Sequence, residues 1–136
     1  MFDETKKYKK TDHFFLRSDG NLESSCNAPQ SGNGVFVVYQ LKHGRIDLVL
    51  IGSSGKIQKS GSLKKTDSLY NSIVNDPQFG ISWISKIKNE NIDGLDIYWY
   101  ETFNQKIKDI PSFVQATLLQ KYLDIYGRLP DWNKEF

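Results

Sequence analysis

The sequence predicts an α/β domain, an α+β sandwich in which a small, mainly antiparallel sheet of about three strands lies between helices. Three observations predict this fold. The chain has 136 residues, 38% of them hydrophobic, which fits one globular domain with a normal core. Two neighbouring runs rich in Val, Ile, Phe and Leu, at residues 35–41 and 46–51, are typical of paired strands. Apolar residues recur at helical spacing over residues 111–126.

The N-terminal part of the chain is expected to form an arm, one short strand and a loop. Residues 1–10 are highly charged and predict a mobile arm or a short helix. "HFFLR", at residues 13–17, is the first candidate strand. Residues 18–33 are rich in Ser, Asn, Gly and Pro, a composition that favours turns. We therefore assign the arm, strand and loop to residues 1–33 and the globular domain to residues 34–136.

The two apolar runs are expected to form an antiparallel hairpin, because the intervening "KHG" supplies Gly44 for a tight turn. Both runs are more continuous than alternating, which predicts central strands that are covered on both faces. A polar loop that contains several glycines follows at residues 52–66. Asp67 or Ser68 then caps a short helix that extends through Asn75.

Four further features complete the predicted fold. Residues 81–88 show near-helical apolar spacing and predict a second short helix, and "LDIYWYET", at residues 95–102, predicts another strand. Pro111 suits the first turn of the long helix, and Gly127 suits its C-terminal stop. The tail "RLPDWNKEF" is expected to be extended and to pack on the core through Leu129 and Trp132.

The composition excludes several classes of protein and of site. Cys26 is the only cysteine and so cannot form an internal disulfide, and with only His13 and His43 beside it a structural zinc site is excluded. A metal ion would therefore have to be held by oxygen atoms. No apolar stretch reaches the roughly 18 residues of a membrane span, and the N-terminus lacks the hydrophobic region of a signal peptide. We expect a cytoplasmic protein that has no membrane partner.

The formal net charge is only +2, but the positive residues are unevenly distributed. Between residues 41 and 65 a single acid, Asp47, stands against six cations, Lys42, Arg45, Lys56, Lys59, Lys64 and Lys65. Such a cluster is the electrostatic pattern expected of a segment that binds nucleic acid. The alternative is a lysine-rich surface that is simply solvated.

Two tripeptides at the ends of the adjacent predicted strands resemble the motifs of a nuclease family. "GVF", at residues 34–36, and "LIG", at residues 50–52, resemble the tripeptides that name the GIY-YIG nuclease superfamily. "IGSSGKI" and the C-terminal "DIPSFVQATLLQKYLDIYGRLPDWNKEF" are similar to one bacterial branch of it, in which a Pro-led helix carries a glutamate and precedes a Gly-x-Leu-Pro-x-Trp-Asn tail. The resemblance covers residues 34–136. The alternative is that Gly34 and Gly52 are ordinary turn glycines.

This resemblance implies metal-assisted cleavage of phosphodiester bonds. In the family, two strand tyrosines position the water and the scissile phosphate, a helix arginine neutralises the developing charge, and a glutamate holds one divalent cation. Mg²⁺ or Mn²⁺ would be the cofactor of an active member, because such hard ions prefer anionic oxygen ligands.

The residues at the family's catalytic positions lack this chemistry. The GIY tyrosine falls on Phe36, which has no hydroxyl, and the YIG tyrosine falls on Leu50, an ordinary core residue. The arginine falls on Ser72 if the Gly-rich loop is an insertion, or on Ser60 if it is not, and the amphipathic context favours Ser72. The glutamate falls on Gln115, which removes the anion. The resemblance therefore implies a catalytically inactive copy of the fold without a bound metal.

Three functions remain open at this point. The first is a nuclease-like domain that binds DNA through the six cations, or regulates another protein, without cleaving. The second is an active DNA endonuclease that depends on Mg²⁺ or Mn²⁺ and uses other residues. The third is a protein-interaction module that recognises a protein partner and no nucleic acid.

Overall fold

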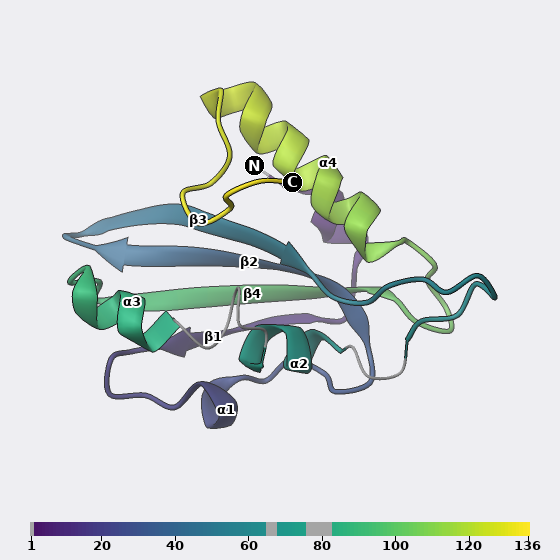
Figure 1. Cartoon of the computed structure of the whole chain (residues 1–136), viewed down its shortest axis with the longest axis horizontal. Coiled ribbons are helices and arrows are strands. Elements are labelled where there is room, and N and C mark those ends of the chain that lie inside the picture. The colour runs from purple at the N-terminus through teal and green to yellow at the C-terminus, as the bar shows by residue number, and fades with distance from the viewer. Residues whose placement is uncertain (1, 65–67, 76–82) are drawn as a thin grey trace.

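A four-stranded antiparallel sheet forms the centre of the computed structural model, with helices on both of its faces (Figure 1). The structure describes residues 2–64, 68–75 and 83–136. The strand order is β1-β4-β2-β3, and the strand bounds are Thr11–Leu16 (β1), Asn33–Lys42 (β2), Arg45–Ser53 (β3) and Gly94–Phe103 (β4). The predicted α+β fold, with an antiparallel sheet between helices, is confirmed.

The sheet has one strand more than the three or so that we expected. β1 pairs with β4 along its whole length, with Phe14 opposite Ile97 and Leu16 opposite Leu95. Phe14 and Leu16 are buried, whereas Phe15 between them is half exposed, as in a strand with one covered face. The pattern around "HFFLR" indicated a strand, but its partner lies far away along the chain, so the pattern did not indicate that the strand joins the central sheet.

β2 and β3 form the predicted hairpin, but β3 lies at the edge of the sheet. His43 and Gly44 occupy the turn with φ angles of 52° and 74°, which suit the twist of a tight hairpin. β2 is central as expected, whereas the prediction that both apolar runs are central strands is wrong for β3. The register shifts after Val38, so that Val49 and Leu50 both belong to the same core. This bulge accounts for an apolar run that does not alternate.

The C-terminal tail covers the exposed edge of β3. The Trp132 N–H donates to the Val49 carbonyl at 2.8 Å. The Ile51 N–H donates to Asn133 Oδ1 at 2.9 Å, and Asn133 Nδ2 donates back to the Ile51 carbonyl at 2.9 Å. Leu129 and Trp132 pack against the two cores, as predicted. The tail therefore supplies the hydrogen bonds that a neighbouring strand would supply.

The longer helices lie on opposite faces of the sheet, with α2 (Leu69–Val74) and α3 (Trp83–Asn89) on one and α4 (Pro111–Tyr126) on the other (Figure 1). α4 has the predicted bounds, and Gly127 ends it in the left-handed region with a φ of 71°. The predicted helix over residues 81–88 corresponds to α3, and residues 81 and 82 lie outside the described ranges. No helix in these ranges is long and apolar enough to span a bilayer.

Side-chain caps begin two of the short helices, whereas the first helical segment has none. A 3-10 helix, η1 (Asp3–Lys7), occupies the charged N-terminal segment. α1 (Leu22–Ser25) lies within the segment predicted as a loop, and the Asn21 side chain caps it by accepting a backbone N–H at 3.2 Å. Ser68 caps α2 in the same way at 3.1 Å, whereas Asp67, the other predicted cap, lies outside the described residues.

Side chains of alternate strand residues form one apolar core on each face of the sheet. The core beneath α2 and α3 includes Phe36, Leu50 and Trp83. The core beneath α4 includes Val35, Val37 and Leu118. Phe36 and Tyr39, three residues apart on β2, thus face opposite sides of the sheet, as their spacing predicted.

Gly34 and Gly52 are strand residues, so the interpretation that they are turn glycines is wrong. A Cβ on Gly34 would overlap the carbonyl oxygen of Tyr100 and lie 2.8 Å from the Thr102 nitrogen, both on β4. A Cβ on Gly52 would overlap the ring of Phe36. Close approach of a backbone and of a ring explains both glycines.

Candidate functional site

The four residues at the family's catalytic positions do not share one cavity. Phe36 and Leu50 are fully buried in the core beneath α2 and α3. Gln115 lies on α4, and Ser72 lies on α2. A cavity beside the C-terminal tail is lined by both Leu50 and Gln115, whereas Ser72 lines a separate cavity and Phe36 lines neither. The structure thus brings two of the four residues together.

The position of Phe36 makes it a packing residue. Its ring is 0% exposed and lies edge-on to Trp83, with ring centroids 6.4 Å apart. It also fills the space above Gly52 where a Cβ would otherwise stand.

Phe36→Tyr, which introduces the tyrosine that the GIY-YIG resemblance implies at this position, is expected to lower the free energy of unfolding by about 1–3 kcal/mol, because the added hydroxyl leaves water for a packed core. Urea unfolding measures this loss. Phe113→Tyr on the exposed side of α4, where the ring is 68% exposed, is the control and should leave stability unchanged. Equal stabilities for wild type and Phe36→Tyr would contradict this assignment of Phe36 to packing.

Gln115 is held in a hydrogen-bond network on the edge strand. Its Nε2 donates to the Ile51 carbonyl at 3.0 Å, and its Oε1 accepts from Ser53 Oγ at 2.6 Å. Ile51 also bonds to Asn133 through both of its backbone groups. Because a carbonyl can only accept, the orientation of the Gln115 amide is fixed by Ile51. The amide thus joins α4, β3 and the tail.

The residues around Gln115 do not fit the Mg²⁺ or Mn²⁺ ion of an active family member. The side chain is neutral, and its oxygen already accepts a bond from Ser53. Within residues 2–64, 68–75 and 83–136, no three His, Cys, Asp or Glu side chains are placed to hold a metal ion. Divalent ions of this class need anionic oxygen ligands, so we derive no metal-dependent step from this site.

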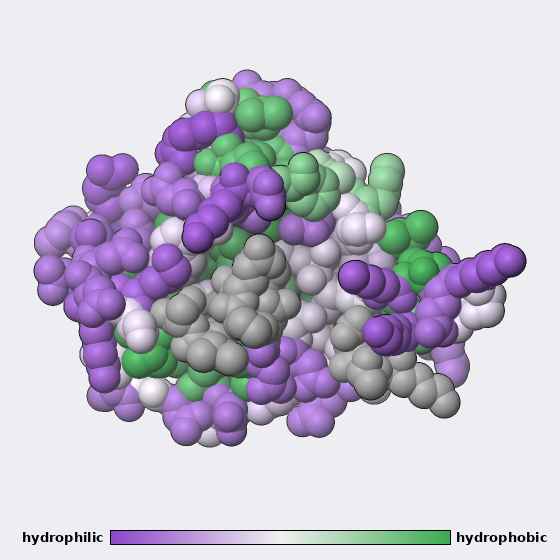
Figure 2. Space-filling view, in the orientation of Figure 1, coloured by the Kyte–Doolittle hydropathy of each residue, from purple (hydrophilic) through white to green (hydrophobic). Residues whose placement is uncertain are grey.

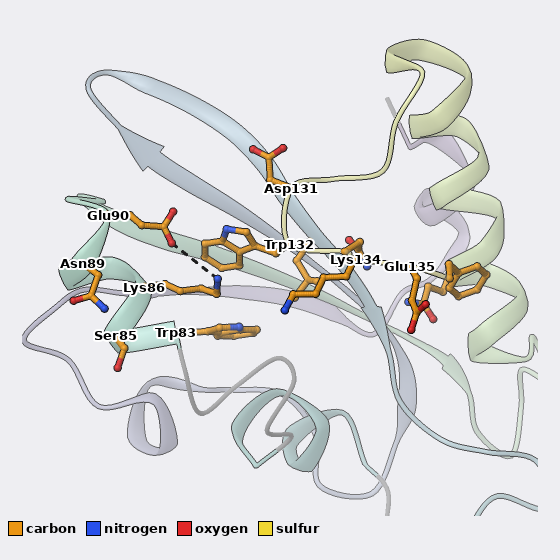
Figure 3. A pocket seen from close by; sticks show the side chains of 13 residues that line it. Trp83, Ser85, Lys86, Asn89, Glu90, Asp131, Trp132, Lys134 and Glu135 are labelled. Atoms are coloured by element: carbon orange, nitrogen blue, oxygen red, sulfur yellow. Dashed lines mark ion pairs between the residues drawn. The ribbon is translucent and has the colours of Figure 1, made fainter.

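The cavity beside the tail has a volume of about 720 Å³ and a partly aromatic lining (Figure 3). The Lys86 side chain extends between Trp83 and Trp132, with its Nζ 4.8 Å from the Trp132 ring centroid. Lys86 also pairs with Glu90 at 3.9 Å, and Asp131 pairs with Arg128 outside the cavity lining at 2.8 Å. Glu90 and Asp131 are thus each matched to a cation. Among the described residues, no hydrogen bond joins a nucleophilic side chain of this lining to a base.

A second group of candidate site residues surrounds the loop after β3. This loop is itself a small hairpin. Ile57 and Leu63 form a bridge, the Lys64 N–H donates to the Lys56 carbonyl at 3.2 Å, and Gly61 makes the turn with a φ of 86°. The hairpin projects from the end of the sheet (Figure 1), and its side chains form a hydrophilic protrusion (Figure 2). The hairpin therefore extends its lysines beyond the end of the sheet.

A cavity of about 710 Å³ lies on one side of this hairpin. Lys56 and Lys64 line it together with four serines, Ser53, Ser54, Ser72 and Ser112. Serine hydroxyls and ammonium groups are the donors that contact phosphate oxygens in nucleic-acid complexes. Ser72, at the family's arginine position, therefore lies among groups that can bind an anion.

Another cavity, of about 670 Å³, lies on the other side of the hairpin. Its lining combines Ser60, the alternative arginine position, with Lys10, Lys106 and Lys108. The carboxylate of Glu101 is buried at its base, where it pairs with Lys10 at 3.7 Å. Lys106 and Lys108 were not predicted as site residues, because they lie in an acid-rich segment of the sequence. The turn after β4, which bridges residues 103 and 108, brings them beside the hairpin.

The acid nearest to these lysines in sequence has its own partners. Asp109 pairs with Lys7 at 2.9 Å and accepts a hydrogen bond from the Tyr8 hydroxyl at 2.7 Å. Hydrogen bonds from Lys7 and Tyr8 lower the pKa of Asp109, and burial together with Asp109 raises the pKa of Tyr8. Asp109 therefore does not neutralise the surrounding lysines.

The hairpin and the turn after β4 together form what we name the basic end. We define it by five lysines that have no ion pair among the described residues: Lys56, Lys59, Lys64, Lys106 and Lys108. Lys42 and Arg45 flank the β2–β3 turn, at the opposite end of the sheet (Figure 1). Strands of this length separate the two ends by about 25 Å. Lys65 lies outside the described residues.

A scan against protein-family models found no match, and searches of the curated proteins and of the solved structures found none either.

Proposed function

We propose that this chain is a non-cleaving, GIY-YIG nuclease-like domain that binds DNA phosphates in the cytoplasm through its basic end. The observation that carries this proposal is a group of five lysines without an ion pair among the described residues, four of which line two cavities that also contain serines. Lysines that neutralise phosphates release condensed counterions, which is the main source of sequence-independent affinity for DNA.

The geometry of the basic end supports phosphate contacts in particular. The hairpin projects from the end of the sheet (Figure 1), and its residues line both cavities, so both cavities contain ammonium and hydroxyl groups. Contacts of this kind position a nucleic-acid backbone and carry no base specificity. We therefore expect binding that is strongly dependent on salt and weakly dependent on sequence.

The absence of cleavage in this proposal is supported by the chemistry of the family's positions. Phe36 and Leu50 supply packing, and Gln115 supplies a structural amide. Ser72 is the one of the four that lies at the basic end, where a hydroxyl contributes a hydrogen bond but no positive charge. Phosphoryl transfer requires neutralisation of charge and an activated nucleophile, and these residues provide neither.

The triple variant Lys56→Ala, Lys59→Ala, Lys64→Ala tests the proposal. We expect the affinity for a short DNA duplex to fall by at least about tenfold. The slope of log K against log salt concentration should become shallower by about 3, because each phosphate contact contributes roughly 0.9 to it. Fluorescence anisotropy at several salt concentrations measures both quantities.

The matched control removes the same charge from the opposite end of the sheet, by Lys42→Ala, Arg45→Ala and Lys88→Ala. Binding that falls equally in both variants would contradict the assignment to the basic end. No salt-dependent binding by the wild type would favour a protein-interaction function instead. A plasmid-nicking activity would contradict the non-cleaving assignment if it requires Mg²⁺ or Mn²⁺, co-purifies with the wild type and is lost in a variant.

A further inference from the structure

An aromatic cavity lies on the α4 face of the sheet, near the β2–β3 turn and far from the basic end. Its volume is about 240 Å³. α4 packs mainly on β2 and β3, which leaves the half of this face toward β1 open. Aromatic and aliphatic side chains and one carboxylate line the cavity: Phe15, Tyr39, Leu41, Ile46, Asp96, Tyr98 and Tyr100.

The strand register places Asp96 at the centre of this cavity. Tyr39 on β2 and Phe15 on β1 are its direct neighbours across the sheet. Gly94, two residues earlier on the same face of β4, has no side chain, and Tyr98 stands two residues later. One carboxylate is therefore enclosed by aromatic rings on three sides.

The tyrosine rings are held in place by each other and by His13. Tyr39 and Tyr98 are nearly perpendicular, with an interplanar angle of 82° and centroids 5.6 Å apart. His13 stacks on Tyr98 at 4.7 Å, and its Nδ1 lies 2.8 Å from Asp96 Oδ1. His13 thus fixes both the second tyrosine ring and the carboxylate.

The charge of the cavity comes from Asp96. Among the described residues His13 Nδ1, 2.8 Å away, is the basic group paired with Asp96, and it carries a charge only when protonated. Within the same ranges Arg17, whose stem lies near Gly94, makes neither an ion pair nor a ring contact. Burial is the main cause that raises the pKa of Tyr39 to about 12, and the neighbouring Tyr100 is the second. Burial is also the main cause that raises the pKa of Tyr98, and the charge of Asp96 is the second. Both hydroxyls therefore stay protonated at neutral pH.

We propose that this aromatic cavity binds the quaternary ammonium group of a small free molecule. π faces and a carboxylate attract a cation, and Asp96 would repel the phosphates of a nucleic acid stacked on the same rings. Most of the lining is aromatic or aliphatic, a surface that the methyl groups of a quaternary ammonium can contact and that the N–H groups of a strongly hydrated primary ammonium cannot hydrogen-bond. A cavity smaller than the roughly 300–1,000 Å³ of drug-sized pockets suits a ligand of the size of choline.

Titration of the full chain with choline chloride, followed by the NMR signals of the tyrosine rings, tests this proposal. We expect saturable shifts for Tyr39 and Tyr98. The compound 3,3-dimethylbutan-1-ol is the neutral carbon isostere of choline. It should bind about tenfold more weakly, because it lacks the charge that the rings and Asp96 attract. Equal binding of the two compounds would overturn the proposal, because the cavity would then select for shape alone.

Two variants and two further probes complete the test. Asp96→Asn, which preserves shape, and Tyr98→Leu should each weaken choline binding by about tenfold, while Tyr126→Leu on the exposed side of α4 should leave it unchanged. Unchanged binding in Asp96→Asn would overturn the proposal. Tighter binding of a peptide that contains trimethyl-lysine would overturn the free-molecule assignment. Binding of a single-stranded oligonucleotide that is lost in Tyr98→Leu would replace it with base stacking.

Discussion

Gly34→Ala is expected to lower the free energy of unfolding by about 3 kcal/mol or more. The new methyl group would overlap the Tyr100 carbonyl oxygen and approach the Thr102 nitrogen on β4. Both neighbours are backbone atoms of a central strand, so neither can rotate away as a side chain would. β2 must then separate from β4, which removes hydrogen bonds from the middle of the sheet.

Gly94→Ala is the matched control for this prediction, because Gly94 is also a strand glycine. Its Cβ would lie 3.3 Å from the nearest atom, the Leu16 carbonyl oxygen, so a shift of a few tenths of an ångström accommodates it. Chemical unfolding of both variants should give a loss below about 1 kcal/mol for the control. Similar losses in the two variants would contradict the steric explanation of Gly34.

Gln115→Glu, which introduces the carboxylate that the GIY-YIG resemblance implies at this position, is expected to destabilise the protein by about 2 kcal/mol at neutral pH instead of creating a metal site. The amide of Gln115 donates to the Ile51 carbonyl at 3.0 Å. A carboxylate cannot donate, so it would face that carbonyl oxygen in a position that is 7% exposed. Asn133 would remain as the donor to Ile51, which limits the loss.

The pH dependence of this variant follows from the same contact. Burial beside a carbonyl disfavours the ionised form, so the pKa of a glutamate at position 115 should be higher in the folded than in the unfolded chain. The destabilisation is then fully present above the folded pKa and is relieved as the pH falls through it.

Thermal unfolding of Gln115→Glu from neutral to acidic pH, with and without Mg²⁺, measures both effects. Gln105→Glu, at an exposed position after β4, is the control and should show neither. Stabilisation of Gln115→Glu by Mg²⁺ would contradict our conclusion that the surrounding groups do not fit a metal.

Features that depend on neighbouring residues could be predicted from the sequence. The bounds of α4 follow from Pro111, which fits a first helical turn, and Gly127, which adopts the left-handed conformation that ends a helix. The β2–β3 turn follows from the "KHG" segment for the same reason. The place of β1 in the sheet depends on β4, and the sequence around β1 contains no information about that distant partner.

The candidate site was less predictable because it is assembled by tertiary contacts. The sequence indicated the lysines of the hairpin after β3, but Lys106 and Lys108 join them only through the turn that follows β4. Lys42 and Arg45 were grouped with the hairpin by sequence proximity, whereas the length of β3 separates them from it. Gln115 was predicted as a lost ligand, and its role as a donor to Ile51 depends on the packing of α4 against the edge strand.

The tail that lies along β3 also bears on how copies of this protein behave toward one another. An edge strand exposes N–H and carbonyl groups through which two sheets can join and aggregate. Asn133 occupies both groups of Ile51, and the Trp132 N–H occupies the carbonyl of Val49. Trp132 and Asn133 therefore block the edge-to-edge pairing of two copies of the protein at this strand.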